Sequence, residues 1–219
     1  GMFSACRKLK KVKLPKNLKE IGEEVMKVLE VQGLKKRFFS NKSGKYLQAV
    51  DDVSFHVNQG EFFGIVGESG CGKSTVAKMI MGLLPKDEGT VMINGEAISY
   101  PYTKEVYKKI QMVFQMPRDS FDPRRTIGQC LKTTLNNFGG SGKEAADQAE
   151  KLLLQMGLQV EYMDKYPNEM SGGECQRAAL ARAMAAGPQI MVCDEATSAL
   201  DVTVQKQILE LLKGLHDQK

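Results

Sequence analysis

The sequence is poor in the side chains that build metal centres and disulfide frameworks. It holds two histidines and five cysteines among 219 residues, and no two cysteines form a C-x-x-C pair. A structural zinc site is therefore not expected, and an odd, dispersed set of thiols suits a reducing cytoplasm. No apolar run approaches the ~20 residues that a membrane-spanning helix needs. The basic N-terminus also lacks the apolar block of a secretory signal.

Acidic residues are absent from the first 19 positions, which carry seven lysines and arginines. Because the whole chain has a net charge of +5, the remaining 200 residues sum to −2. A nucleic-acid groove would usually spread positive charge over a folded face, whereas here the positive charge belongs to a tail. The tail could contact anionic lipid or RNA. We favour the simpler interpretation, a solvated and partly disordered extension.

The most informative stretch fits the phosphate-loop pattern G-x-x-x-x-G-K-[ST] and runs Gly67-Glu68-Ser69-Gly70-Cys71-Gly72-Lys73-Ser74-Thr75. Apolar Phe62–Val66 before it predicts a buried strand, and Val76–Leu84 after it predicts a helix. The glycines thus fall where backbone N–H groups and a helix dipole attract anionic phosphate. We predict a nucleotide site in which Lys73 reaches the β- and γ-phosphates and the Ser74 hydroxyl ligates Mg²⁺.

Strands alternate with helices along the rest of the chain, which indicates a mostly parallel α/β sheet. Strands are expected at 29–32, 53–57, 90–93, 110–114 and 190–193. Helices are expected at 17–28, 145–156, 174–186 and 202–213, and the segment 116–170 is helical and irregular in character. Asn94-Gly95 predicts a hairpin turn, Gly157 a helix cap, and His56 is expected to face solvent.

Two acids follow the apolar strand predicted at 190–193. A carboxylate at the end of a strand downstream of the phosphate loop is the position from which Asp194 would hold Mg²⁺. Glu195, which follows it, would polarise the attacking water as general base. The alternative is an idle pair of exposed acids, and it would be preferred if the chain lacked Lys73 and Ser74.

A second glycine turn, Ser171-Gly172-Gly173, opens a predicted helix and is a second anion site by the same physics. Two phosphate sites in one chain make sense if they face different nucleotides. Gln115, the run Ser171–Gln176, the strand with its acids Ile190–Glu195, and Ser198–Asp201 follow in that order. With the phosphate loop, these motifs make residues 28–219 resemble the ATP-binding subunits of ABC transporters.

The resemblance implies a P-loop NTPase (RecA-like) core with an antiparallel β subdomain and an α-helical subdomain. Residues 1–27 would be a basic extension, 28–114 and 178–219 the core with its β subdomain, and 115–177 the helical subdomain. ATP and Mg²⁺ are the implied cofactors. Gln115 and Glu195 would be catalytic, with Gln115 also at the metal, and Asp201 would contact nucleotide.

An aromatic side chain that stacks on adenine is also implied by the resemblance. Phe38 stands where the family places it, and Tyr46 is the second candidate. An ordinary core phenylalanine is the alternative for Phe38.

Three further runs resemble the oligopeptide, dipeptide and nickel uptake group: Asp119–Gly128, Tyr166–Met170 and Ser198–Gln205. They imply a peripheral ATPase at the cytoplasmic face of a membrane, in an importer for peptides or a related small solute. Two such subunits would pair head to tail, so that ATP meets Lys73 and Ser74 of one subunit and Ser171–Gly173 of the other. Integral membrane permease subunits would dock near Gln115 and the helical segment, with no direct solute contact and no nucleic acid.

Two other functions remain open. A soluble ABC ATPase could act on nucleic acid or ribosomes through the basic tail, although such proteins usually carry two cassettes and this chain has one. A non-catalytic fragment or regulatory subunit is the other.

Three departures from the family pattern bear on these expectations. Glu174 stands where many relatives have glutamine, and Ala196 replaces the proline usual in the uptake group. The family's switch histidine follows one more strand after the last helix, and His216 is not that histidine. We therefore expect a fragment of a longer protein that hydrolyses ATP poorly. A gap or a substitute strand should separate the strands 62–66 and 190–193, and they should not pair directly.

Overall fold

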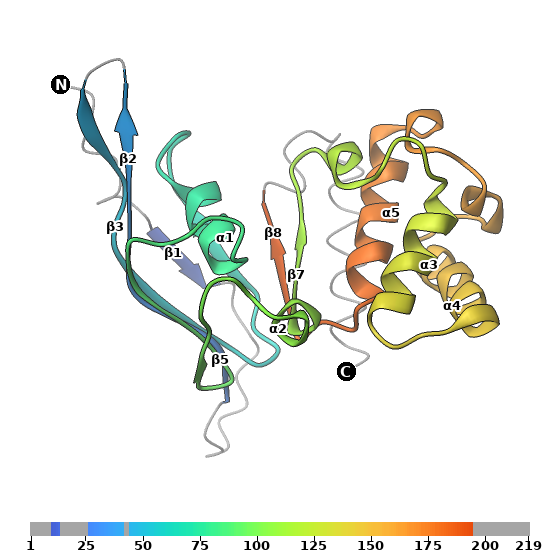
Figure 1. The fold of residues 1–219 in the computed structure, drawn as a ribbon, viewed down its shortest axis with the longest axis horizontal. Coiled ribbons are helices and arrows are strands. Elements are labelled where there is room, and N and C mark those ends of the chain that lie inside the picture. The colour runs from blue at the N-terminus through green and yellow to red at the C-terminus, as the bar shows by residue number, and fades with distance from the viewer. Residues whose placement is uncertain (1–9, 14–25, 42–43, 195–219) are drawn as a thin grey trace. The chain divides into compact units, whose positions relative to one another are not determined.

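The computed structural model describes residues 10–13, 26–41 and 44–194. The chain forms two compact units, which join in the sequence at Thr103 and Lys104 (Figure 1). The first unit contains the predicted phosphate loop, and the second contains the Ser171 turn. Glu195, the run Ser198–Asp201 and the predicted helix 202–213 lie outside the described residues.

Four antiparallel strands in the order β3-β2-β5-β6 dominate the first unit. They are β2 (Lys27–Ser40), β3 (Lys45–Asn58), β5 (Glu88–Ile93) and β6 (Glu96–Ala97). The β2–β3 hairpin pairs Val31 with Phe55, and both side chains are buried. The predicted strands 29–32 and 53–57 are the inner parts of these longer strands. The register shifts around Gly33, where φ is 59°, so the alternating pattern is broken there.

The ends of this sheet test three local predictions. Asn94 and Gly95 have φ values of 52° and 80° and connect β5 to β6, which confirms the hairpin turn. His56 is exposed, as expected. Most of the predicted helix 17–28 lies outside the described residues, but its end is wrong. Lys27 pairs with Asn58 and begins β2, because pairing with β3 overrides local helix preference.

A two-stranded antiparallel ribbon leads into the phosphate loop. β4 (Phe63–Val66) pairs with β1 (Lys10–Lys13), and Lys10 lies opposite Val66. The strand expected beside the loop is thus present, one residue shorter than predicted. Its partner comes from the chain's own basic segment, so residues 10–13 are paired backbone, which corrects the view of that segment as a solvated extension throughout. Among the described strands, β4 and β8 belong to separate sheets and do not pair directly, as expected. β1 pairs with β4 alone, so a strand lying between β4 and β8 is not observed among them.

Helix α1 (Lys73–Ile80) follows the loop and buries Val76, Met79 and Ile80. The sequence predicted a helix over 76–84, so the helix begins earlier and ends earlier than expected. It ends because Gly82 is left-handed, with φ of 65°. The Leu83 N–H then donates to the Lys78 carbonyl at 2.9 Å and the Gly82 N–H to the Met79 carbonyl at 3.1 Å, the Schellman pattern.

The second unit is mainly helical. Its elements are α2 (Lys104–Lys109), β7 (Ile110–Val113), η2 (Pro117–Ser120), α3 (Ile127–Asn137), α4 (Gly142–Gln155), η3 (Val160–Met163), η4 (Pro167–Glu169), α5 (Gly172–Met184) and β8 (Ile190–Cys193). α3, α4 and α5 pack around one core, whose fully buried members include Leu131, Ala149, Leu153 and Leu180. β7 and β8 pair in parallel, with Ile110 opposite Ile190. This is the only parallel pair among the described strands, so a mostly parallel sheet is not observed there.

The helix α4 ends as predicted at Gly157, which has φ of 70°. The Leu158 N–H donates to the Leu153 carbonyl at 3.0 Å, and both leucines are buried. α3 was not assigned individually, although Thr126 and Gln129 form a reciprocal capping box at its start. α2 was missed because it buries no side chain and has no apolar stripe. Within the described ranges, no helix is long and apolar enough to span a membrane.

Candidate functional site

The phosphate loop connects the end of β4 to the first residue of α1. Gly70 has φ of 77° and Gly72 has φ of 98°, a region that other residues enter at a cost. Gly72 is the N-cap of α1, and its carbonyl accepts the Val76 N–H at 2.9 Å. The N-terminus of α1 therefore follows the loop directly. The N–H groups in the first turn of a helix have no acceptor within the helix, so they attract anions.

Lys73 lies across this loop. Its Nζ donates to the carbonyls of Gly67 and Glu68, each at 2.9 Å, and lies 3.8 Å from Cys71 Sγ. Cys71 is buried and anchors the loop. The lysine thus places one positive charge at the helix N-terminus, next to the hydroxyl residues Ser74 and Thr75. An ammonium and a helix N-terminus at the same position suit a polyphosphate.

The tip of the β2–β3 hairpin carries the aromatic candidates. Phe38 pairs with Leu47, whereas Phe39 pairs with Tyr46, and the rings of Phe39 and Tyr46 lie 5.3 Å apart, edge to face. Because side chains alternate between the faces of a strand, Phe38 and Tyr46 lie on opposite faces. Phe38 is 39% exposed, so it is not an ordinary core residue. Phe39 was not considered from the sequence, although its neighbour was.

The second glycine turn lies at the start of α5, with Ser171 as the N-cap. Ser171 Oγ accepts the Glu174 N–H at 3.3 Å, and Glu174 Oε2 accepts the Ser171 N–H at 2.8 Å. This reciprocal capping box explains why the helix starts at Gly172. The Ser171 hydroxyl proton can still be donated to a phosphate oxygen, because the capping bond uses Oγ as the acceptor.

Glu174 is held in its ionised form. The Tyr162 hydroxyl donates to Glu174 Oε1 at 2.5 Å. This hydrogen bond, followed by the bond from the Ser171 backbone, lowers the pKa of Glu174 to about 2. The same contact raises the pKa of Tyr162. The carboxylate that departs from the family pattern is therefore turned back onto its own helix.

Gln115 and Asp194 follow the carboxyl ends of the two parallel strands. Gln115 is exposed, just after β7, and Asp194 comes directly after β8. The Asp194 N–H donates to the Val113 carbonyl at 3.0 Å, which continues the β7–β8 ladder. The structure thus brings these two predicted metal-site residues to the same edge of the sheet, where α/β proteins bind ligands.

The predicted Mg²⁺ site has few candidate protein ligands. Among the described residues, no three His, Cys, Asp or Glu side chains gather into a metal cluster. Mg²⁺ usually takes one or two carboxylates and completes its shell with phosphate oxygens and water. Ser74 and Asp194 each carry an oxygen of a type that Mg²⁺ accepts, and they belong to different units. Glu195 and Asp201 lie outside the described residues.

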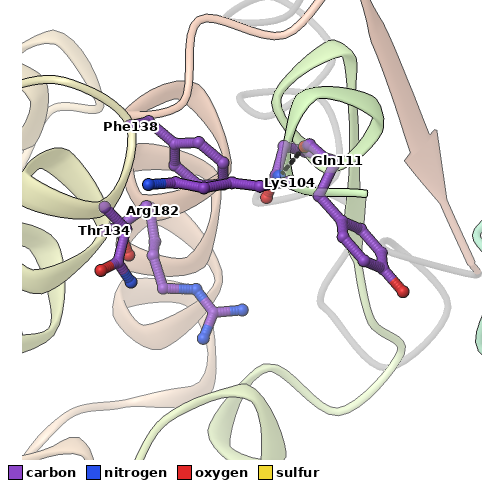
Figure 2. Close-up of a pocket in the computed structure, with 7 residues that line it drawn as sticks. Lys104, Gln111, Thr134, Phe138 and Arg182 are labelled. Carbon is purple, nitrogen blue, oxygen red and sulfur yellow. Dashed lines mark hydrogen bonds between the residues drawn. The ribbon is translucent and has the colours of Figure 1, made fainter. Parts of the chain in front are cut away.

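A pocket of about 570 Å³ lies within the second unit, and sequence reasoning did not identify it (Figure 2). It is lined by Lys104, Tyr107, Gln111, Thr134, Asn137, Phe138 and Arg182. These side chains come from α2, β7, the end of α3, and α5. The lining combines two cations with two aromatic rings. No motif revealed it, because its residues are scattered over four elements.

Comparison with known proteins gives a consistent result. The family model described as "ABC transporter" matches residues 50–198. The oligopeptide transport ATP-binding protein OppF of Haemophilus influenzae is 42% identical over 177 residues, covering 78% of this chain and 53% of that protein. OppF of Bacillus subtilis is 39% identical over 199 residues, covering 88% of this chain and 65% of that protein. The chain therefore spans between about half and two thirds of the length of these curated relatives.

Solved structures agree on the fold. The dimeric structure of a post-hydrolysis state of the ATP-binding cassette MJ0796, bound to ADP and Pi, superposes with a TM-score of 0.75. It is 30% identical in sequence, and the match covers 87% of this chain and 83% of that chain.

Proposed function

The chain belongs to the ABC transporter family, and we propose that it is the ATP-binding and ATP-hydrolysing part of an importer for peptides or a related small solute, nickel included. The carrying observation is the phosphate loop, where Lys73 and the left-handed Gly72 meet at the start of α1. The relatives named as oligopeptide transport proteins support the class of solute.

In this proposal, the first unit binds the nucleotide tail. Lys73 neutralises the β- and γ-phosphates, backbone N–H groups of residues 67–75 surround them, and Ser74 supplies a hydroxyl ligand to Mg²⁺. The ion would polarise the phosphoryl oxygens. Phe38 would stack on adenine from the hairpin, which its exposed ring permits.

The second unit would act on the nucleotide of a partner subunit. A head-to-tail dimer would set Ser171, Gly172 and Gly173 of one chain against the phosphates held by Lys73 of the other. The capped N-terminus of α5 is suited to this role because it presents N–H groups and a hydroxyl together. The dimeric MJ0796 cassette supports such a pairing.

Hydrolysis would depend on the edge that carries Gln115 and Asp194. We assign Asp194 and Gln115 to the magnesium ion, Glu195 to proton removal from the attacking water, and Asp201 to nucleotide contact. The division into residues 28–114 with 178–219 and a helical part at 115–177 belongs to the same proposal.

Membrane permease subunits would dock beside Gln115 and the helical part of the second unit, at the cytoplasmic face of the membrane. The pocket between α2, α3 and α5 supports this, because arginine and aromatic side chains are enriched at protein interfaces. Solute would be held by other subunits.

Thermal unfolding with Mg-ATP tests the proposal. Saturation a hundredfold above the dissociation constant should stabilise the chain by ~2.7 kcal/mol. Lys73→Ala should abolish most of the shift, whereas Lys78→Ala, an exposed lysine in the last turn of the same helix, should retain it. If saturating Mg-ATP left the melting temperature of the wild-type chain unchanged, the assignment would be overturned.

A further inference from the structure

One peptide group, between Met170 and Ser171, is held from both sides by charged side chains. The Met170 carbonyl accepts a hydrogen bond from Arg118 Nη2 at 2.5 Å. The Ser171 N–H of the same group donates to Glu174 Oε2 at 2.8 Å. Because C=O and N–H point in opposite directions across a trans peptide, the cation and the carboxylate hold opposite edges of one plane.

We propose that Arg118 and Glu174 form a clamp on this peptide, and that the clamp orients Ser171 and the N-terminus of α5 toward the nucleotide of the partner subunit. Arg118 and Glu174 are positioning residues in this scheme, since they act through Ser171. The inference rests on the proposed function, and it names the residues through which the second phosphate site is held in place.

The carboxylate side of the clamp has its own support. Tyr162 donates to the other oxygen of Glu174 at 2.5 Å, so both carboxylate oxygens are engaged. Lys165 Nζ lies 3.9 Å from the centre of the Tyr162 ring. A carboxylate fixed at both oxygens cannot swing toward the phosphate side, where its charge would repel the nucleotide.

The arginine side connects the clamp to Gln115. Arg118 belongs to η2, which begins two residues after Gln115. A second hydrogen bond joins α5 to the same short helix, in which Arg182 Nη1 donates to the Ser120 carbonyl. The Arg182 guanidinium also lies 5.1 Å from the Phe121 ring centre. Arg118 of η2 thus binds the residue before the N-cap of α5, and Arg182 in the last turn of α5 binds η2. A shift of the segment after Gln115 would therefore also move Ser171.

The experiment measures two properties of the 219-residue chain separately. Binding of a fluorescent ATP analogue reports the phosphate loop of one subunit, and sedimentation with Mg-ATP in the Glu195→Gln background reports dimer formation. Arg118→Met, Glu174→Leu and Tyr162→Phe should leave analogue binding within about twofold of wild type. Arg118→Met and Glu174→Leu should weaken the dimer roughly 10- to 100-fold, the scale on which a misplaced group disturbs a site, and Tyr162→Phe should weaken it less.

A matched control is available in the same segment. Arg124 pairs with Asp122, and its side chain is 88% exposed, so Arg124→Met should dimerise as its parent does. Arg118→Lys keeps the charge without the planar fork and should recover part of the loss. Melting temperatures identify any variant that fails to fold. If Arg118→Met or Glu174→Leu does not fold, dimerisation of Arg118→Lys and Tyr162→Phe tests the clamp instead.

The Ser171 amide resonance gives a third readout, which needs no nucleotide. Glu174→Leu should move it strongly and Arg124→Met should not. Failure of the wild-type chain to bind the analogue would overturn the proposed function, and the clamp with it. If the Glu195→Gln parent dimerises and the Arg118 and Glu174 variants made in it dimerise equally well, the clamp alone is wrong. A Glu195→Gln parent that binds the analogue without dimerising also overturns the clamp.

Discussion

Tyr102 closes the end of the helix that Lys73 begins. Its hydroxyl donates to the Ile80 carbonyl at 3.0 Å, and its ring covers Gly82, where an added Cβ would lie 2.7 Å from the ring. The last residue but one of the first unit therefore fixes the far end of the phosphate-loop helix. Loss of this contact should loosen α1 without touching the loop itself.

Gly82→Ala should be strongly destabilising for two separable reasons. A left-handed alanine costs about 1–2 kcal/mol, and the new methyl group would collide with Tyr102. Gly157→Ala is the matched control, because Gly157 has φ of 70° in the same helix-ending motif with open space around it. Urea unfolding should show a larger loss at position 82 than at 157. Equal losses would show that the Tyr102 ring moves aside freely.

Phe38→Ala should weaken ATP binding by roughly 1–3 kcal/mol, the value of stacking one base on an aromatic ring. Phe39→Ala and Tyr46→Ala should have little effect on affinity, because these rings share the other face of the hairpin. Titration calorimetry with Mg-ATP measures all three variants. A loss confined to Tyr46→Ala would assign adenine to the opposite face.

Acid should act on the Ser171 turn only at low pH. The pKa of Glu174 is lowered from 4.5 to about 2, so its contribution to stability is complete above about 4.5 and is lost as the pH falls toward about 2. Tyr162→Phe removes the largest cause of the lowered pKa and should move this loss to higher pH. The Glu174 carboxyl carbon resonance, followed from pH 7 to pH 2, measures both titrations.

Glu195→Gln should preserve ATP binding and lower turnover ~100-fold or more, the scale of a lost general base. Steady-state phosphate release and nucleotide binding, measured in a form of the protein that turns over ATP, separate the two effects. Glu161→Gln, an exposed carboxylate in η3, serves as the control. Near-normal turnover in Glu195→Gln would mean that another group positions the water.

Local sequence signals predicted those parts of the fold that depend on neighbours along the chain. Gly72-Lys73, Asn94-Gly95 and Gly157 each need a special backbone angle, and the structure has it at each. Pairing between strands that are distant in the sequence could not be predicted from such local signals. The Lys10–Lys13 strand has no apolar alternation, and only its pairing with β4 makes it a strand.

The site shows the same division. Lys73, Ser171 and Asp194 could be predicted because fixed spacings mark them. The positions of Arg118 and Tyr162 could not, because the carbonyl of Met170 and the carboxylate of Glu174 that they bind lie far from them in the sequence. Arginine and tyrosine at such positions have no local signature that separates them from ordinary surface residues.

The pairing of β1 with β4 also bears on how the protein folds. The β2–β3 hairpin lies entirely between these two strands in the sequence, and its contacts are local by comparison. Bringing β1 and β4 together closes a longer loop, which costs more chain entropy before any stabilising contact can form. We therefore expect the hairpin to form early and the ribbon beneath the phosphate loop to form late, so that newly made chains acquire nucleotide affinity only in the last stage of folding.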